Sequence, residues 1–262
     1  MAAPRLVRLL DRLLRPLGYE AQPRRRPAGA AECEELIGRI RASTMVARPG
    51  LVSLYEQALF CEQAGVPGAF VECGVWKGGA VGLMALVNLR HGRTRRHLHL
   101  FDAFGDICQP DPQVDGERAV REAGMGRGVG ELQGNLVPLA GFYAARGGPG
   151  TLEENRRLLE CDIGYDPGFV HYHAGWFQQT LPIGAPGVGS IAILRLDADW
   201  YASTRVCLEH LFAQVVAGGF VVIDDYGAYD GCRRAVDEFL ARGGRPHFLH
   251  RCGAEIRYLV VP

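Results

Sequence analysis

Four aspartates follow two apolar stretches of the chain, two at the end of each stretch. Asp197 and Asp199 end the first stretch, and Asp224 and Asp225 end the second. If both stretches are buried parallel strands, their carboxyl ends lie at one edge of a sheet, where open α/β sheets bind ligands. Carboxylates this close repel one another unless a hard cation such as Mg²⁺ neutralises them. The pattern therefore predicts a divalent-metal site, although a single strand-end aspartate more often caps a helix or forms a turn.

A second group of residues favours a nucleoside ligand. Glu72 and Gly74 belong to a predicted strand over 69–75, and Gly78 opens a predicted helix, so the backbone there can approach a ligand closely. The spacing differs from the G-x-G-x-x-G of dinucleotide folds, and a carboxylate would repel a pyrophosphate. It would attract the cationic amino group of S-adenosylmethionine, whose ribose hydroxyls could be bound by Asp102 at the next strand end. Taken singly, each motif is explained as well by packing glycines or a strand-end aspartate.

Two histidines, His171 and His173, alternate in a predicted strand and should therefore point to the same face. A zinc site needs more ligands than this pair, and the neighbouring sequence offers none. We expect packed or surface histidines here, with a catalytic base as a minor alternative.

The elements that must position these residues alternate along the chain. Predicted strands at 69–75, 97–102 and 169–173 precede the two acid-ended stretches, and a predicted helix over 204–216 separates those two stretches. The runs 247–250 and 255–260 are expected to form a terminal antiparallel pair. This alternation predicts a doubly wound α/β sheet.

The segment 105–150 interrupts the alternation, because it is rich in glycine and proline and has weak periodicity. A connection of this length is usually a lid or a binding insertion. Directly after it, Thr151 and Glu154 have the spacing of a capping box and predict the start of a helix.

The composition is that of a water-soluble globular chain. The 262 residues have a formal net charge of zero, so no overall basic field favours nucleic acid. No apolar run approaches the roughly 20 residues needed to cross a bilayer. Eight scattered cysteines without a signal peptide predict reduced thiols in a cytoplasmic protein, with Cys73 and Cys207 as small core residues.

Residues 1–30 form a distinct appendage in which leucines recur at helical spacing among arginines, followed by the proline-arginine stretch 23–27. We expect a helix that docks on the domain or on a sister subunit. The alternative is a weak contact of residues 1–20 with an anionic membrane surface, peripheral to its inner face.

Together these motifs carry a family resemblance. The chain resembles the macrocin O-methyltransferase family, whose members methylate sugar hydroxyls of macrolide and aminocoumarin antibiotics with S-adenosylmethionine and a metal. The matching segments are 44–45, 71–79, 101–104, 175–182, 194–199, 218–227 and 231–236. The resemblance implies a class I methyltransferase fold with a seven-stranded sheet over residues 31–262, with 105–150 as the insertion that reads the substrate. It also implies that the chain forms homo-oligomers.

The resemblance assigns roles to individual residues. It implies that Mg²⁺ is held by Asp197, Asp224 and Asp225 and that Asp199 is the catalytic base. It implies further that six residues bind S-adenosylmethionine: Thr44, Glu72, Gly74, Gly78, Asp102 and Trp176. The family commonly has serine where this chain has Ala103, which puts one hydrogen bond to the cofactor in question.

The expected reaction is transfer of a methyl group to a sugar hydroxyl, in a small secondary metabolite or a surface glycan. One alternative is a metal-dependent glycosyltransferase, because Asp-x-Asp after a strand also holds a metal on a nucleotide-sugar. Another is a non-catalytic adaptor that retains the fold. The glycosyltransferase gives no role to Glu72, and the complete set of acids weighs against the adaptor.

Overall fold

The computed structural model describes residues 29–124, 136–244 and 246–262. The chain divides into two compact units, Met1–Glu35 and Leu36–Pro262. Helix α2 (Ala30–Ile40) begins in the first unit, and the remaining described elements belong to the second. The predicted amphipathic helix and its linker, including the suggested membrane contact of residues 1–20, lie outside the described residues.

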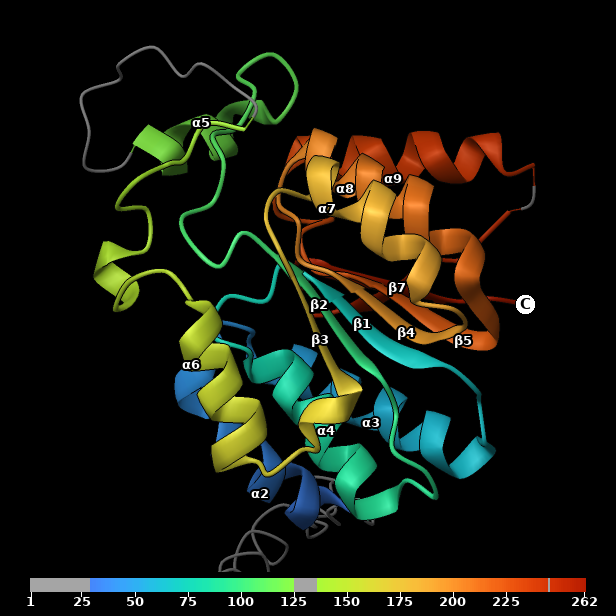
Figure 1. Cartoon of the computed structure of the whole chain (residues 1–262). Helices are drawn as coiled ribbons and strands as arrows, with labels where there is room; N and C mark the ends of the chain where they lie inside the picture. Colours follow the sequence, from blue (N-terminus) through green and yellow to red (C-terminus); the bar gives the residue numbers. More distant parts are fainter. Residues whose placement is uncertain (1–28, 125–135, 245) are drawn as a thin grey trace, which may run out of the picture. The chain divides into compact units, whose positions relative to one another are not determined.

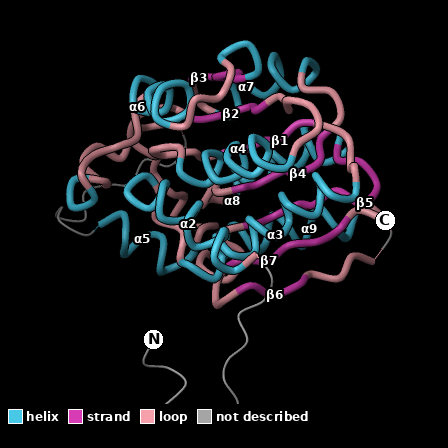
Figure 2. The backbone as a smooth tube through the Cα atoms, turned by 90° about the horizontal axis from the view of Figure 1, so that it is seen from below, coloured by secondary structure: helices cyan, strands magenta, loops and turns pink. Residues whose placement is uncertain are grey.

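A seven-stranded sheet forms the centre of the second unit, in the order β3-β2-β1-β4-β5-β7-β6 (Figure 1, Figure 2). The strands from β3 to β5 are parallel, and β7 runs antiparallel to β5 and β6. The strands are β1 (Ala69–Cys73), β2 (Leu98–Asp102), β3 (Val170–Ala174), β4 (Ile191–Leu196), β5 (Val215–Ile223), β6 (His250–Cys252) and β7 (Ile256–Val260). The predicted doubly wound sheet and terminal antiparallel pair are confirmed, although β6 begins where the predicted run 247–250 ends.

Helices cover both faces of this sheet: α3 and α4 lie on one face, and α7, α8 and α9 on the other (Figure 1). The described α-helices of the second unit are α3 (Arg48–Ala64), α4 (Gly79–His91), α5 (Gly116–Gly124), α6 (Leu152–Arg156), α7 (Phe177–Gly184), α8 (Tyr201–Leu211) and α9 (Asp230–Arg242). Short helical turns of other types span Arg41–Ser43, Ala144–Arg146, Arg157–Asp162, Pro167–Phe169, Ala185–Gly187 and Phe212–Gln214. Because both faces are covered, every residue of β1 and β4 is buried, which is why these strands are almost continuously apolar in sequence.

Helix α8 differs from the predicted span 204–216 at both ends. It ends at Leu211, and Val215 already pairs with Ile191 of β4, so the sheet takes residues that the helical periodicity included. It begins early because Asp115, from the insertion, accepts a hydrogen bond from the Tyr201 amide at 2.7 Å. That carboxylate satisfies a free helix N–H from outside the local sequence, where propensity patterns do not register it.

In its described parts, 105–124 and 136–150, the insertion has more structure than its weak periodicity predicts. It contains α5 and an isolated antiparallel bridge between Cys108 and Pro138, and Trp200 donates its indole N–H to the Cys108 carbonyl at 2.8 Å. The insertion is therefore tied to the segment that carries the aspartates. Directly after it, Thr151 and Glu154 form the predicted capping box.

The histidines of β3 contact His99 of β2 and His97, which directly precedes β2. His171 and His173 contact His97 and His99, with Nδ1 to Nε2 distances of 2.8 Å for the pair His97–His171 and 3.1 Å for the pair His99–His173. The expectation that His171 and His173 share a face is confirmed. Burial, reinforced by the neighbouring rings, lowers the pKa of His99 to about 3, so this imidazole is neutral at neutral pH.

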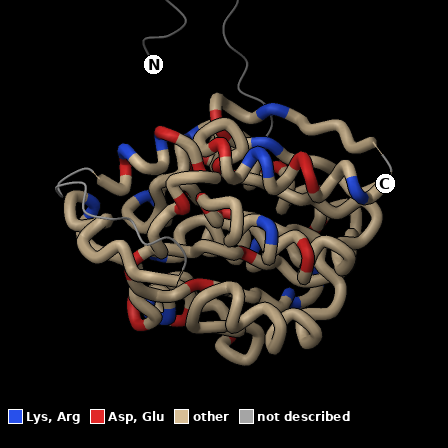
Figure 3. The backbone as a smooth tube through the Cα atoms, turned by 90° about the horizontal axis from the view of Figure 1, so that it is seen from above, with Lys and Arg blue, Asp and Glu red and all other residues tan. Residues whose placement is uncertain are grey.

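Cys73 and Cys207 are buried core residues with free thiols, as expected. Acidic and basic positions are interspersed over the described backbone (Figure 3), in agreement with the zero formal net charge. Within the described residues, no helix combines the length and apolarity that a membrane span requires.

Candidate active site

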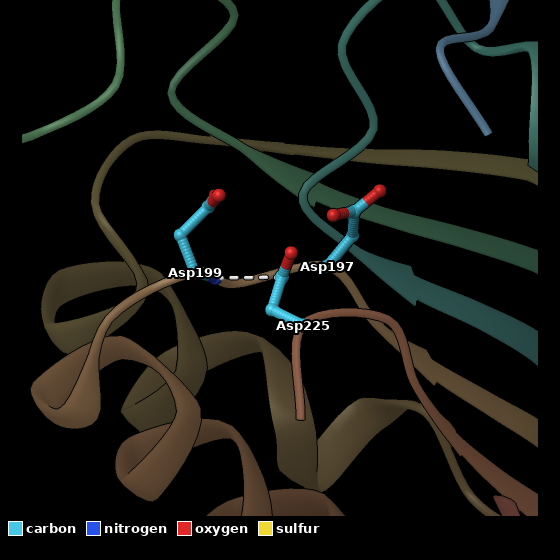
Figure 4. Close-up of side chains that lie close together, drawn as sticks. All are labelled: Asp197, Asp199 and Asp225. Carbon is cyan, nitrogen blue, oxygen red and sulfur yellow. Dashed lines mark hydrogen bonds between the residues drawn. The ribbon is translucent and has the colours of Figure 1, made fainter. Parts of the chain in front are cut away.

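Three carboxylates come together at the carboxyl ends of β4 and β5. One oxygen each from Asp197, Asp199 and Asp225 lies within 4.8 Å of the other two. Figure 4 shows the three side chains pointing to the same side of the strand ends. The sequence predicts that these acids meet at one edge of the sheet, and the structure brings them together there.

Neighbouring strands fix the backbone that carries the acids. The Asp197 amide donates to the Cys73 carbonyl of β1, and the Asp224 amide donates to the Leu196 carbonyl of β4, each at 2.8 Å. Asp199 has a φ of 55°, a left-handed conformation that is uncommon for a residue other than glycine. Strained backbone of this kind is concentrated at functional sites, where the surrounding structure enforces it.

The acids strongly influence one another's ionisation. Burial, followed by the charges of Asp197 and Asp224, raises the pKa of Asp199 well above its usual range. Burial, followed by Asp199 and Asp197, raises the pKa of Asp225 in the same way. The Asp199 amide donates to Asp225 Oδ2 at 3.1 Å. The cluster thus holds more negative charge than its surroundings neutralise, and a divalent cation would relieve this.

Asp224, the third ligand implied by the resemblance, is not in this close group, and one of its oxygens contacts a different residue. Arg195 donates through Nη2 to Asp224 Oδ1 and through Nη1 to Asp197 Oδ2, the latter at 2.9 Å. Burial raises the pKa of Asp224 to about 7 despite the opposing effect of Arg195. Asp224 still lines the cavity above the strand ends. Arg195 was not predicted to belong to the site, although a lone basic residue inside a buried strand indicates a paired charge.

Two cavities meet the acid cluster. The smaller cavity is lined by Gly74, Asp102 and Trp176 of the predicted cofactor set. Trp76 and the acids Asp197 and Asp199 also line it. The larger, of about 1180 Å³, shares Gly74 and Asp102 with it and extends to Asp225 and Tyr229. Pockets for one small ligand are usually smaller, about 300–1,000 Å³, so the larger cavity has room for a cofactor and an acceptor.

Asp102 organises the turn that carries Gly74. Its carboxylate accepts hydrogen bonds from the amides of Val75 at 2.5 Å, Trp76 at 3.1 Å and Phe104 at 2.6 Å. Burial raises the pKa of Asp102, while these amides lower it. The side chain therefore both lines the cavity and holds the backbone of its wall.

The other residues of the implied cofactor set are placed differently. Trp176 and Gly74 line the smaller cavity, whereas Glu72, Thr44 and Gly78 line neither of the two cavities. Glu72 is buried, and its Oε1 accepts from Arg195 Nη1 at 2.6 Å. Thr44 is buried and accepts from the Val46 amide, and a Cβ on Gly78 would collide with Asn155 rather than with a ligand.

Two tyrosines at the site were not predicted from the sequence: Tyr143 of the insertion, and Tyr229 after β5. Tyr143 lines both cavities, and its ring centroid lies 6.4 Å from that of Trp76. Across the larger cavity, Tyr229 donates to Glu122 of α5 at 2.6 Å. No motif marks Tyr143, because its place depends on how residues 136–150 pack against Trp76 in the turn after β1.

The donor set and cavity fit the expected ligands. Three carboxylate oxygens within 4.8 Å of one another suit a hard divalent cation and are too few and too hard for a soft thiophilic metal. The adjoining wall of Gly74, Asp102 and the Trp76 and Trp176 rings combines close backbone approach, an acceptor and flat apolar surfaces. Such a wall suits an adenosyl group.

Comparison with known proteins agrees with this chemistry. The family described as macrocin-O-methyltransferase (TylF) matches residues 23–126 and 160–251. The 8-demethyl-8-(2,3-dimethoxy-alpha-L-rhamnosyl)-tetracenomycin-C 4'-O-methyltransferase of Streptomyces olivaceus is 37% identical over 80% of this chain and 73% of its own length. Demethyldecarbamoylnovobiocin O-methyltransferase of Streptomyces niveus is 34% identical over 68% of this chain and 60% of its own length.

Solved structures give the same result for the fold. The O-methyltransferase NovP superimposes with a TM-score of 0.68 at 28% identity, covering 87% of this chain and 88% of that chain. An O-methyltransferase from Bacillus cereus, solved with S-adenosylhomocysteine, has a TM-score of 0.50 over 96% of this chain and 97% of its own. At 12% identity, that second likeness concerns the fold alone. The class I methyltransferase fold expected from the sequence is confirmed.

Proposed function

The chain belongs to the macrocin-O-methyltransferase family, and we propose that it methylates a sugar hydroxyl of a glycosylated small molecule, with S-adenosylmethionine as donor and Mg²⁺ as metal. One curated relative is named for a rhamnosyl-tetracenomycin acceptor, and another for demethyldecarbamoylnovobiocin. One observation carries the proposal: the acids Asp197 and Asp199 share a cavity with the turn of Gly74 and Asp102. A metal site and a methyl-donor site would then face a common acceptor.

Asp197 and Asp225 are the proposed ligands that the geometry supports most directly, since their oxygens belong to the close group. Asp224 lies outside this close group. Arg195 contacts its Oδ1, so Oδ2 is the oxygen that we propose for the metal. When bound, Mg²⁺ would supply a Lewis acid that makes a neighbouring sugar hydroxyl more acidic. An aspartate alone, with an ordinary pKa near ~4, is too weak a base to do this.

Asp199 is the proposed base, and it accepts the hydroxyl proton on a carboxylate oxygen. It lines both cavities, so it can reach an acceptor on either side. Its backbone amide is engaged with Asp225, and its left-handed φ of 55° orients the side chain toward the other acids. Burial and the repulsion from neighbouring acids, which raise the pKa of Asp199, also make it a stronger proton acceptor.

Trp76, Tyr143 and Trp176 line the same cavity as the acids Asp197 and Asp199. They exclude water and restrict how the acceptor and donor can sit. Placing the sugar oxygen in line with the methyl group is the largest contribution that such walls make to a transfer reaction.

The proposal is tested by incubating the purified chain with S-adenosylmethionine, Mg²⁺ and a panel of glycosides that includes rhamnosylated aromatic polyketides. We expect a methylated sugar in the mass spectrum of the product and no product from the Asp197→Asn variant. Calorimetry separates the alternatives. A glycosyltransferase would bind a UDP-sugar in place of S-adenosylmethionine, and an adaptor would bind neither.

We propose in addition that the chain forms homo-oligomers and that residues 1–20 make a weak contact with anionic membranes. Light scattering and sedimentation with anionic vesicles, each compared with a chain that lacks residues 1–28, test them.

A further inference from the structure

Arg195 lies among carboxylates from three neighbouring strands. Its side chain is 2% exposed, and it contacts Glu72 of β1, Asp197 after β4 and Asp224 after β5. These strands are adjacent in the sheet, so the guanidinium spans the middle of the strand ends. A planar guanidinium with several N–H donors can hold more than one carboxylate at fixed angles, which a single ammonium group cannot do.

Glu72 is shielded from the cavity. Its side chain is 1% exposed, and it lines neither cavity. Oε1 accepts from Arg195 Nη1 at 2.6 Å, while Oε2 has no hydrogen-bond partner within the described residues. A carboxylate buried in this way interacts mainly with its paired cation.

We propose that Arg195 is a positioning residue that fixes one oxygen of Asp197 and one of Asp224 for the metal, and that Glu72 supports metal binding through Arg195 instead of binding the methyl donor. This inference rests on the proposed function.

Arg195 and Glu72 have complementary roles in this arrangement. Arg195 uses Asp197 Oδ2 and Asp224 Oδ1, so each carboxylate keeps its other oxygen for a metal. The cation also repels a metal, and Glu72 offsets that repulsion from the side remote from the cavity. Without the charge of Glu72, Arg195 competes more strongly with the metal for Asp197 and Asp224.

The test uses the isosteric Glu72→Gln variant of the full chain and measures two affinities separately. Mn²⁺, which reports on the Mg²⁺ site, is titrated by calorimetry and by electron paramagnetic resonance without cofactor. S-adenosylhomocysteine is titrated in EDTA. We expect Mn²⁺ affinity to fall about tenfold, which is about 1.4 kcal/mol, and S-adenosylhomocysteine affinity to change less than about twofold. Loss of S-adenosylhomocysteine affinity with unchanged Mn²⁺ affinity would overturn the proposal, because Glu72 would then be a cofactor ligand.

A matched control is available in the pair Arg96–Glu62, whose Nε and Oε1 lie 2.6 Å apart and whose side chains are 9% and 5% exposed. Glu62→Gln makes the same chemical change in a buried pair that lines neither cavity. It should lower the melting temperature without changing either affinity. If Glu62→Gln weakens Mn²⁺ binding as much as Glu72→Gln does, the effect is general destabilisation and the proposal is wrong.

Arg195→Lys provides a second variant in case Glu72→Gln does not fold. This variant keeps the positive charge but removes the planar guanidinium with its several N–H donors. We therefore expect weaker Mn²⁺ binding with unchanged S-adenosylhomocysteine binding. Wild-type Mn²⁺ affinity in Arg195→Lys would overturn the positioning role. Failure of the proposed function gives a different result, since the wild-type chain itself would then not bind S-adenosylhomocysteine.

Discussion

Gly74 and Asp197 approach each other so closely that a Cβ on Gly74 would lie 1.8 Å from the Asp197 carbonyl oxygen. The contact joins the turn after β1, which lines the cofactor wall, to the first acid after β4. Gly74 also has a φ of 84°, which other residues rarely adopt. The two halves of the site are therefore in backbone contact, and a side chain between them must displace one of them.

We expect Gly74→Ala to lower the free energy of unfolding by well over the roughly 1–2 kcal/mol that a left-handed conformation costs an ordinary residue. Gly65→Ala is the control, because Gly65 has a similar φ of 68° and an added Cβ there would meet nothing within 4 Å. Urea denaturation of both variants measures the difference. Equal losses in the two variants would show that the contact with Asp197 is unimportant.

Replacing Asp199 tests whether this residue is the catalytic base or a metal ligand. If Asp199 accepts the proton, Asp199→Asn should lower kcat by about 10²–10⁴-fold and leave Mn²⁺ affinity nearly unchanged. Asp225→Asn, which removes a carboxylate of the same cluster, should weaken Mn²⁺ binding itself. Calorimetry with Mn²⁺ alongside single-turnover kinetics gives both quantities. If Asp199→Asn loses as much Mn²⁺ affinity as Asp225→Asn does, Asp199 is a metal ligand and the assignment as base is wrong.

Asp115 connects the insertion to the helix behind the acids. Its Oδ1 accepts from the Tyr201 amide at the start of α8, and its Oδ2 accepts from the Asp111 amide, each at 2.7 Å. Removing both acceptors with Asp115→Ala should cost about 0.5–2 kcal/mol of stability, as for a lost helix cap. Asp115→Asn keeps one oxygen and should cost less. Thermal unfolding of the two variants tests this order.

His99 should make the fold sensitive to acid. Its pKa is lowered from 6.5 to about 3 in the folded chain, chiefly by burial, so the unfolded chain binds this proton first as the pH falls. The contribution of neutral His99 to stability is therefore full above pH 6.5 and is lost toward pH 3. The loss approaches about 1.4 kcal/mol per pH unit between these limits.

His99→Phe keeps a ring in the stack and removes the titration. Its unfolding free energy should fall less steeply than that of the wild type between pH 6.5 and 4, measured by urea denaturation at several pH values. Replacing the exposed His250 with phenylalanine controls for the loss of a histidine elsewhere. Parallel curves for the wild type and His99→Phe would rule out this origin of acid sensitivity.

The sequence predicts the parts of this fold that depend on local pattern. The apolar strands with acids at their ends, the glycine turn at Gly74 and the capping box at Thr151 all have signals within a few residues. The features that the sequence does not predict depend on contacts between residues far apart in the chain. The Asp115 carboxylate caps a helix that begins at Tyr201, and Arg195 engages Asp224 and Glu72 from an adjacent strand. Likewise, the place of Tyr143 depends on the path of the insertion, which no periodicity encodes.

The most direct test is methyl transfer from S-adenosylmethionine to a rhamnosylated acceptor by EDTA-treated protein, with and without added Mg²⁺. We expect no transfer in EDTA, recovery on addition of Mg²⁺, and no recovery for Asp197→Asn, whereas Asp237→Asn on the exposed side of α9 recovers like the wild type. Full turnover of the metal-free protein, or of Asp197→Asn, would contradict a metal-dependent transfer at these acids.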